Sequence, residues 1–277
     1  MFNIKLFSKE ELQEISRDNY NEDREYPENF SNWYKHILDF GDFKHTEVVA
    51  NQIFTFDESE FMRKEDNINK VDWGTMNDIL KPTLDRLDSM SVYNIKNGTF
   101  SNKFDFSTCM TTKRDLAENL WKINYVSAMY DTGGYTELVV RKPLPFCLDT
   151  ENPTIYNGMP LREEVRVFYN METKQVEYSV DYWDYEYCRS NIGSISDGIV
   201  FDWFHNKYGD REINHIKKVN ELETRIQTMI CNLKFDGELE GVWSIDFLWV
   251  KETDEIYLID MARGFRSAYW NPENIAS

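Results

Sequence analysis

Apolar runs separated by short polar breaks are clearest in the last quarter of the sequence. Two runs rich in Ile, Val, Trp, Tyr and Phe cover Val242–Val250 and Ile256–Met261, and the polar segment Lys251–Glu255 joins them. Runs of this length and composition are typical of β-strands, and a polar connection of five residues is typical of a hairpin loop. The pattern therefore predicts an antiparallel hairpin near the end of the chain.

The register of this hairpin brings two acidic residues together. If Val250 pairs with Ile256, Asp246 lies directly opposite Asp260. Side chains in such positions have Cβ atoms roughly 4.5–5.5 Å apart, and like charges there repel each other. A cation between them removes the repulsion, and Mg²⁺ prefers such oxygen ligands and shares them with substrate phosphates. The alternative is a slipped register in which both carboxylates lie on a solvated face.

The rest of the chain shows two kinds of pattern. The first ninety residues combine short helical patterns with one strand-like run, Thr46–Phe56, and predict an N-terminal unit over 1–90 that offers a partner or substrate surface. Residues 91–277 alternate strands and helices in an α+β plan with two sheets and a cleft between them. The expected elements in that part are strands at Val92–Ile95, Thr99–Phe106, Thr136–Lys142, Glu163–Tyr169 and Gln175–Trp183, and helices at Thr112–Asn124 and Glu212–Leu233.

The net charge of the chain indicates which classes of molecule it can bind. The chain has 277 residues and a formal net charge of −18, from 49 acidic and 31 basic residues. Such a polyanion is a poor non-specific partner for nucleic acid, whose binding depends on neutralising phosphates with Lys and Arg. It is suited to a neutral or basic protein or peptide partner, or to a small ligand in a locally basic pocket.

The cysteines and the lengths of the apolar runs indicate the cellular compartment of the protein. The chain has four widely spaced cysteines without a CxxC motif, which argues against a zinc site and favours a reducing compartment. The N-terminus has no apolar run of signal length, and no stretch approaches 18 consecutive apolar residues. We therefore expect a cytoplasmic protein that does not span a membrane.

Basic side chains lie inside or at the ends of several predicted strands. They are Lys103, Arg141, Lys142 and Arg166. Strand alternation places Glu164 and Arg166 on one face, where an ion pair is the simplest interpretation, and an exposed pair contributes only about 0–1 kcal/mol. Taken with the facing aspartates, the basic set indicates a nucleotide site without a glycine-rich phosphate loop, because neither GxxxxGK[ST] nor GxGxxG occurs.

Several of these segments resemble the ATP-grasp superfamily. They are Lys103–Ser107, which has Phe106 where the family has Trp, Leu138–Lys142, Glu164–Arg166, and the two strands that carry Asp246 and Asp260. The order and spacing are most similar to the eukaryotic cell-division-cycle ATP-grasp family that assembles translation initiation factor two. The resemblance covers residues 70–265 approximately. It implies an ATP-grasp fold with two α/β subdomains and the nucleotide between their sheets.

The resemblance also implies roles for individual residues. Lys103, Arg141, Lys142 and Arg166 would contact ATP phosphates or ribose, with Lys103 and Arg166 acting on the charge that develops during transfer. Glu164 would belong to the same site. The segment 142–145, with Pro143 and Leu144, would run along adenine, and Asp246 and Asp260 would hold Mg²⁺.

The sequence departs from the family in three places, the first of which is Pro143, which has no N–H to donate to adenine. The family's last metal strand reads Asp-Phe-Asn, whereas Asp260-Met261-Ala262 lacks the amide oxygen. The segment Cys147–Pro160 is longer than expected, and is either a lid or substrate loop or a mobile surface insertion.

Two functions follow from these observations. The first is an ATP-dependent ligase that joins a carboxylate to an amine through an acyl phosphate, on a protein, peptide or small molecule. The second is a non-catalytic, ATP-dependent binding or assembly factor for a protein partner. The scattered histidines and the absence of a clear nucleophile suit both, since neither needs an attacking group from the protein itself.

Overall fold

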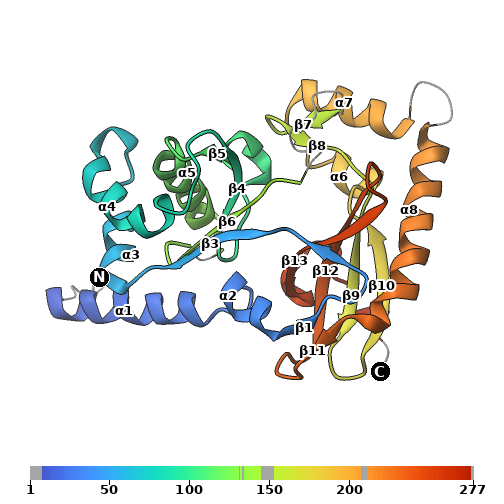
Figure 1. Ribbon diagram of the computed structural model, residues 1–277, viewed down its shortest axis with the longest axis horizontal. Coiled ribbons are helices and arrows are strands. Elements are labelled where there is room, and N and C mark those ends of the chain that lie inside the picture. Colours follow the sequence, from blue (N-terminus) through green and yellow to red (C-terminus); the bar gives the residue numbers. More distant parts are fainter. Residues whose placement is uncertain (1–7, 131, 133, 145–152, 207–210, 276–277) are drawn as a thin grey trace, which may run out of the picture.

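The computed structural model describes residues 8–130, 132, 134–144, 153–206 and 211–275. Helices and several sheets are combined in an α+β fold, as the sequence predicts. Figure 1 shows two lobes, one around β3, β4, β5 and β6 and the other around β9, β10, β12 and β13. None of the helices in the described residues is long and apolar enough to span a membrane.

The first lobe is built on a four-stranded sheet with the order β3-β6-β4-β5. Its strands are β3 (Val48–Ile53), β6 (Glu137–Arg141), β4 (Val92–Asn97) and β5 (Met110–Thr112). Three helices add buried apolar residues to the core of this sheet: α3 (Phe56–Arg63), α4 (Trp73–Leu84) and α5 (Leu116–Met129). Every residue of β6 is buried, which fixes the direction of Arg141 at its end.

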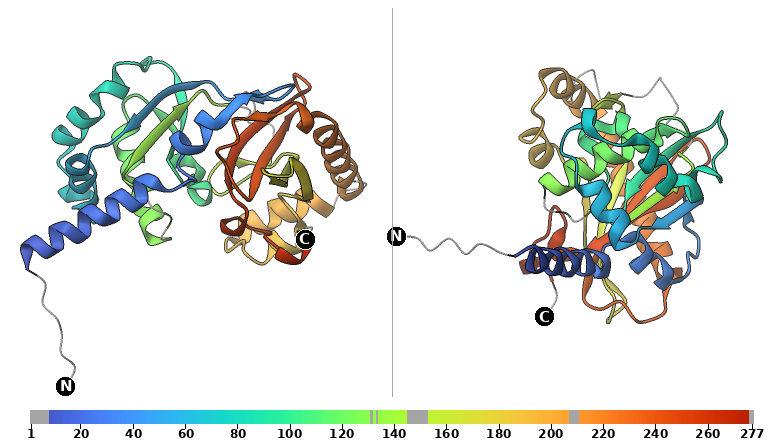
Figure 2. Two further views of the ribbon diagram at one scale, coloured as in Figure 1. Left: turned by 90° about the horizontal axis from the view of Figure 1, so that it is seen from below. Right: turned by 90° about the vertical axis from the view of Figure 1, so that its left-hand side faces the viewer.

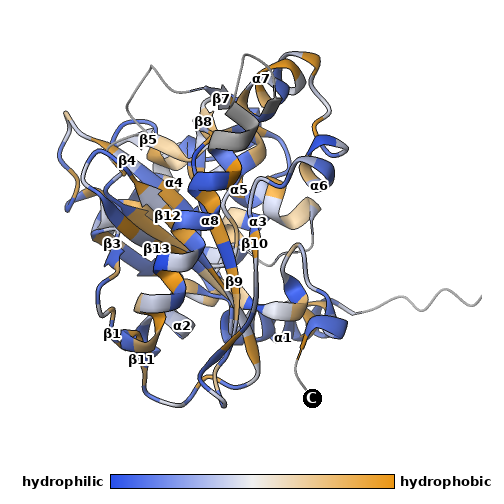
Figure 3. Cartoon of the chain, turned by 90° about the vertical axis from the view of Figure 1, so that its right-hand side faces the viewer, coloured by the Kyte–Doolittle hydropathy of each residue, from blue (hydrophilic) through white to orange (hydrophobic). Residues whose placement is uncertain are grey.

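The second lobe is built on a five-stranded sheet with the order β10-β9-β12-β13-β2. Its strands are β10 (Gln175–Asp181), β9 (Glu164–Asn170), β12 (Val242–Val250), β13 (Glu255–Arg263) and β2 (Lys44–His45). Helix α8 (Arg211–Met229) lies across this sheet, as Figure 3 shows, and buries Val219, Leu222 and Ile226 against it.

Smaller elements surround the two lobes. Helix α1 (Lys9–Glu25) buries none of its side chains and lies along the outside of the molecule (Figure 2). The sequence patterns did not predict α6 (Tyr185–Arg189) or α7 (Ile195–Asn206). The remaining elements are α2 (Phe30–Trp33), β1 (Ile37–Asp39), β11 (Lys234–Phe235), β7 (Thr154–Ile155), β8 (Met159–Pro160), and the 3-10 turns η1 (Tyr34–His36), η2 (Ile68–Lys70), η3 (Lys103–Thr108), η5 (Ile230–Asn232), η6 (Gly264–Arg266) and η7 (Pro272–Asn274).

Residues 1–90, expected as an N-terminal unit of their own, contribute to both lobes. Strand β3 pairs with β6 in the first sheet, and β2 pairs with β13 in the second. Glu28 accepts hydrogen bonds from Arg263 at 2.5 and 3.2 Å. This part of the chain therefore connects the two lobes as well as extending them.

The predicted hairpin is present, and Asp246 pairs with Asp260 as expected. The rest of the hairpin differs from the predicted pairing in two ways. Val250 pairs with Glu255 rather than with Ile256, and a β-bulge follows, in which Ile259 is the extra residue between Asp260 and Leu258. The shorter turn and the bulge each shift the register by one residue, and the two shifts cancel at the aspartates.

Two expected elements are wrong. The segment Thr99–Phe106 is not a strand, because Lys103–Thr108 forms the 3-10 helix η3 and β4 pairs with β5 instead. Part of the expected loop Cys147–Pro160 is regular, since Thr154–Ile155 pairs with Met159–Pro160 in a two-stranded hairpin. Residues 147–152 lie outside the described residues.

Candidate functional site

A cleft lies where the two main sheets face each other. It encloses a cavity of about 140 Å³, and both lobes line it. The first lobe contributes Lys103, Arg141 and Lys142, and the second contributes Glu164, Asp246 and Asp260. The structure therefore brings these six predicted site residues to one cavity.

Asp246 is held by Arg166. The β9–β12 register places the two residues opposite each other, and the Arg166 Nε and Nη2 atoms donate to the two Asp246 carboxylate oxygens at 2.7 and 2.8 Å. The third nitrogen, Nη1, donates to the Ala268 carbonyl at 3.2 Å. Burial lowers the pKa of Arg166, but the charge of Asp246, its hydrogen bonds to Arg166, and the nearby Tyr182 and Glu164 together offset this effect and leave that pKa above its usual value. Arg166 therefore stays charged, and the ion pair positions it.

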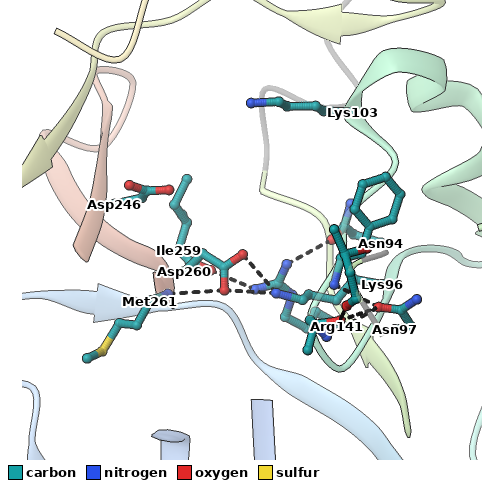
Figure 4. A network of polar contacts seen from close by, with 12 residues as sticks. Asn94, Lys96, Asn97, Lys103, Arg141, Asp246, Ile259, Asp260 and Met261 are labelled. Atoms are coloured by element: carbon teal, nitrogen blue, oxygen red, sulfur yellow. Dashed lines mark hydrogen bonds and ion pairs between the residues drawn. The ribbon is translucent and has the colours of Figure 1, made fainter. Parts of the chain in front are cut away.

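Asp260 is held by a lysine that the sequence analysis missed. The Lys96 Nζ atom donates to both Asp260 carboxylate oxygens at 2.8 Å, and this contact joins β4 of the first sheet to β13 of the second (Figure 4). The Lys96 side chain is 1% exposed and that of Asp260 is 31% exposed. Lys96 carries the signal that singled out the other four basic residues, a charge inside an apolar strand.

The repulsion between the two aspartates is thus relieved by two separate basic side chains. Among the described residues, no group of three or more His, Cys, Asp and Glu side chains could hold a metal ion. Two facing carboxylates still fit Mg²⁺, because that ion usually takes one or two carboxylates and completes its shell with water and substrate phosphates. Each carboxylate also offers about four lone-pair sites, so an ion pair does not use all of them.

Lys103 begins the 3-10 helix η3 and is half-buried. Its Nζ atom donates to the Tyr182 hydroxyl at 2.6 Å, and within the described part of the chain it forms no ion pair. In Figure 4 its side chain lies apart from the Lys96–Asp260 pair and extends toward the side of the cleft that carries Asp246. Burial lowers the pKa of Lys103, while Tyr182 and Glu164 raise it and leave the net pKa above its usual value.

Arg141 joins the two sheets at the bulge. Its Nη1 atom donates to the Ile259 carbonyl at 2.9 Å, and its Nη2 atom donates to Asn94 Oδ1 at 3.3 Å. Because Ile259 is the bulged residue, the irregularity in β13 turns a backbone acceptor toward the cleft. Lys142 lies at the exposed rim, where its ammonium is 2.8 Å from Glu47.

The predicted adenine segment is only partly at the cavity. Leu144 lines it and packs with Leu248 and Val250, which gives an apolar wall beside the charged groups. Pro143 is half-buried and is not among the described lining residues.

Glu164 and Cys109 line the cavity, and both have a shifted pKa. Burial, followed by the charge of Asp246, raises the pKa of Glu164 to about 8, although Lys103 and Arg166 act in the opposite direction. Burial raises the pKa of the Cys109 thiol to about 12. A thiol with that pKa is not a nucleophile near neutral pH.

The charge of the cleft is opposite to that of the molecule. Besides Lys142 at the rim, two basic side chains line the cavity directly, and two more hold the Asp246 and Asp260 carboxylates that line it. These four side chains are Lys96, Lys103, Arg141 and Arg166. In a chain with a formal net charge of −18, these four basic groups outnumber the nearby carboxylates of Asp246, Asp260 and Glu164, a local balance of charge that suits an anionic ligand.

Comparisons of this chain with known proteins found matches among solved structures. No family model matches it, and a search of curated proteins finds no match. Among solved structures, it is similar to Cdc123 from Schizosaccharomyces pombe, at 15% identity and a TM-score of 0.47, over 90% of this chain and 93% of that one. A C-terminally truncated form of that Cdc123 matches at 14% identity and a TM-score of 0.48, over 87% of this chain and 85% of that one.

A third match is a RimK domain ATP-grasp protein from Sphaerobacter thermophilus, at 8% identity and a TM-score of 0.34, over 88% of this chain and 60% of that one.

Proposed function

We propose that the cleft binds ATP together with Mg²⁺. The observation that supports this most is a cavity between two sheets where Lys103 and Arg141 lie beside two facing aspartates and an apolar wall. Lys96 and Arg166 hold those two aspartates. Charge-assisted hydrogen bonds from Lys and Arg are the usual way in which proteins hold phosphates. An apolar wall beside such a group suits the flat ring of a nucleotide base.

The contacts suggest a role for each residue. Lys103 binds phosphate, because its ammonium has no carboxylate partner among the described residues and faces the cavity. Arg141 and Arg166 add positive charge from positions fixed by other contacts. Leu144 and Leu248 pack against adenine, and Lys142 lies at the rim. Asp246 and Asp260 would hold Mg²⁺, which supplies charge neutralisation to the phosphates when bound.

The cavity must open to admit a nucleotide. It encloses about 140 Å³, whereas pockets for small molecules usually span roughly 300–1,000 Å³. The contacts that cross the cleft, Lys96 with Asp260 and Arg141 with the Ile259 carbonyl, are polar and can be exchanged for phosphate oxygens. ATP binding is therefore accompanied by separation of the two sheets.

The reaction that best suits this cleft is ligation of a carboxylate to an amine through an acyl phosphate. In that reaction ATP phosphorylates the carboxylate, the amine attacks, and phosphate leaves, so the protein contributes positioning and charge rather than a nucleophile. The raised pKa of Cys109 fits this requirement. The carboxylate belongs to a protein, a peptide or a small molecule.

A second candidate is ATP-dependent binding of a protein partner without turnover. Two features favour it: Ala262 supplies no amide oxygen next to Asp260, and both aspartates already have a basic partner. The acidic chain suits a neutral or basic protein or peptide. A cytoplasmic location is proposed for either function, because Cys109, Cys188 and Cys231 are free thiols.

Calorimetry with ATP, in the presence and absence of Mg²⁺, tests the site. We expect Lys103→Met to weaken ATP binding at least about tenfold, since a charged hydrogen bond contributes roughly 1.5–3 kcal/mol. Asp260→Asn keeps an acceptor for Lys96 but loses the charge, and should remove the Mg²⁺ dependence. Lys81→Met on α4, an exposed lysine 2.9 Å from Asp85, is the control. Equal ATP affinity in the parent and Lys103→Met would reject the site.

Release of ADP and phosphate separates the two candidates. A ligase releases both when a suitable carboxylate and amine are supplied. A binding factor holds ATP without releasing either, whichever acceptor is added.

A further inference from the structure

We propose that Tyr182 is the positioning residue of this cleft, holding Lys103 and Arg166 toward an anionic ligand. This proposal rests on the proposed binding of ATP in the cleft. The Lys103 ammonium donates to the Tyr182 hydroxyl at 2.6 Å and lies 4.8 Å from the centroid of the same ring. The Arg166 guanidinium lies 4.9 Å from that centroid. One aromatic ring therefore contacts two of the four cations.

The backbone of Tyr182 is held on both sides. Its N–H donates to the Glu164 carbonyl at 3.0 Å, and its own carbonyl accepts from the Tyr269 hydroxyl at 2.8 Å. The ring is buried and packs edge-on against Trp183, with the ring centroids 5.3 Å apart. Tyr182 is thus a fixed point to which a flexible lysine can be attached.

Lys103 needs such a point. A lysine side chain has several rotatable bonds, and binding a ligand through a freely moving one costs conformational entropy. The ammonium has three donors, so the bond to Tyr182 leaves two for ligand oxygens. A carboxylate would also anchor Lys103, but it would cancel the charge that the ligand requires.

The phenol avoids that cancellation because it is neutral. Burial raises the pKa of Tyr182, and although Lys103 and Arg166 act against this, the net pKa stays above its usual value. The Tyr182 hydroxyl therefore positions Lys103 without neutralising it. The face of the ring adds a cation–π attraction for both basic groups.

The test is a double-mutant cycle on ATP binding with Tyr182→Phe and Lys103→Met. Tyr182→Phe keeps the ring and removes only the hydroxyl. We expect it to weaken ATP binding roughly twofold to tenfold, which corresponds to ordering one long side chain. Adenosine, which lacks phosphates, should bind both proteins equally. In the Lys103→Met background, Tyr182→Phe should have no further effect, because the two residues act as one unit.

Tyr178→Phe is the matched control, since Tyr178 lies on β10, just before Tyr182. Among the described residues its hydroxyl hydrogen-bonds only backbone groups, the Tyr269 carbonyl and the Asn271 N–H. It should leave the ratio of ATP to adenosine affinity unchanged. Equal ATP affinity in the parent and Tyr182→Phe would overturn the proposal. So would an equal loss for ATP and adenosine, since that result indicates a general defect in folding.

A measurement without nucleotide separates this proposal from the proposed function. The nitrogen-15 signal of the Lys103 ammonium, assigned with Lys103→Met, should show slow hydrogen exchange in the parent and fast exchange in Tyr182→Phe. If the parent binds no ATP but this change occurs, the ATP function fails and the positioning role stands. If exchange is the same in both proteins, the positioning role fails.

Discussion

Single residues set the electrostatics of the cleft through burial. Glu164 is 3% exposed and lies close to the charge of Asp246, and it also interacts with Lys103, Arg166 and Tyr182. Removing a carboxylate from water disfavours its charged form, and a second negative charge adds to this effect. The two nearby cations do not offset both, which leaves Glu164 with a pKa of about 8.

This shift predicts how stability depends on pH. The pKa of Glu164 is higher in the folded state than in the unfolded state. At pH values between these two pKa values, Glu164 takes up a proton when the chain folds. The stability that Glu164 contributes is fully present below its ordinary pKa and is lost as pH rises through about 8. Glu164→Gln should therefore be more stable than the parent at pH 9, with a smaller difference at pH 5. Urea unfolding of both proteins at pH 5 and pH 9 measures this difference in stability. The same difference at the two pH values would contradict the raised pKa of Glu164.

Irregular elements, rather than regular ones, turn functional groups toward the cleft. The bulge at Ile259 directs a carbonyl to Arg141, and the 3-10 helix η3 places Lys103 at the cavity. After β13, the turn η6 and the residues that follow it bring the Ala268 carbonyl to Arg166. The path of this last segment depends on Gly264, which is buried beneath Trp270.

We expect Gly264→Ala to displace that segment. A Cβ atom there would lie 2.7 Å from Trp270 Cε3 and 3.0 Å from the Val242 carbonyl oxygen, closer than ordinary packing allows. The overpacking should cost roughly 1–3 kcal/mol in urea unfolding and lower ATP affinity through Arg166. Gly193→Ala is the control, because nothing lies within 4 Å of its added Cβ. If the two variants are equally stable, the packing around Gly264 is not a constraint.

At the scale of the whole molecule, the two lobes depend on residues from both ends of the chain. Strand β3 completes the first sheet, and residues of α3 and α4 fill its core. Glu28 pairs with Arg263, and β2 pairs with β13, so the N-terminal part also contacts the second sheet. Helix α1 is different, because it buries no side chain.

Truncations test this arrangement. A chain of residues 91–277 lacks β3 together with buried Met76 and Leu80, and we expect it not to unfold cooperatively by calorimetry or circular dichroism. A chain that begins at residue 26 loses only α1 and what precedes it, and should keep a cooperative transition with a lower midpoint. A cooperative transition in the 91–277 chain would show that the first ninety residues are dispensable for folding.

The sequence by itself determined the strands that carry the chemistry, because alternation and β-branched runs reflect burial on a sheet. It placed Asp246 opposite Asp260, and Glu164 and Arg166 on one strand, since these relations depend on local register. Asp246 pairs with Asp260 as expected, although a shorter turn and a β-bulge lie between this pair and the end of the hairpin. The local sequence pattern predicts neither of these two features.

Only the tertiary structure decided which charge pairs with which. Lys96 and Asp260 are 164 positions apart, and Lys103 and Tyr182 are 79 apart. Contacts over such separations depend on how the two sheets pack, and no periodicity along the chain encodes that packing. The same reason explains why Thr99–Phe106 was expected as a strand: β4 takes β5 as its partner instead, and Lys103–Thr108 forms the 3-10 helix η3.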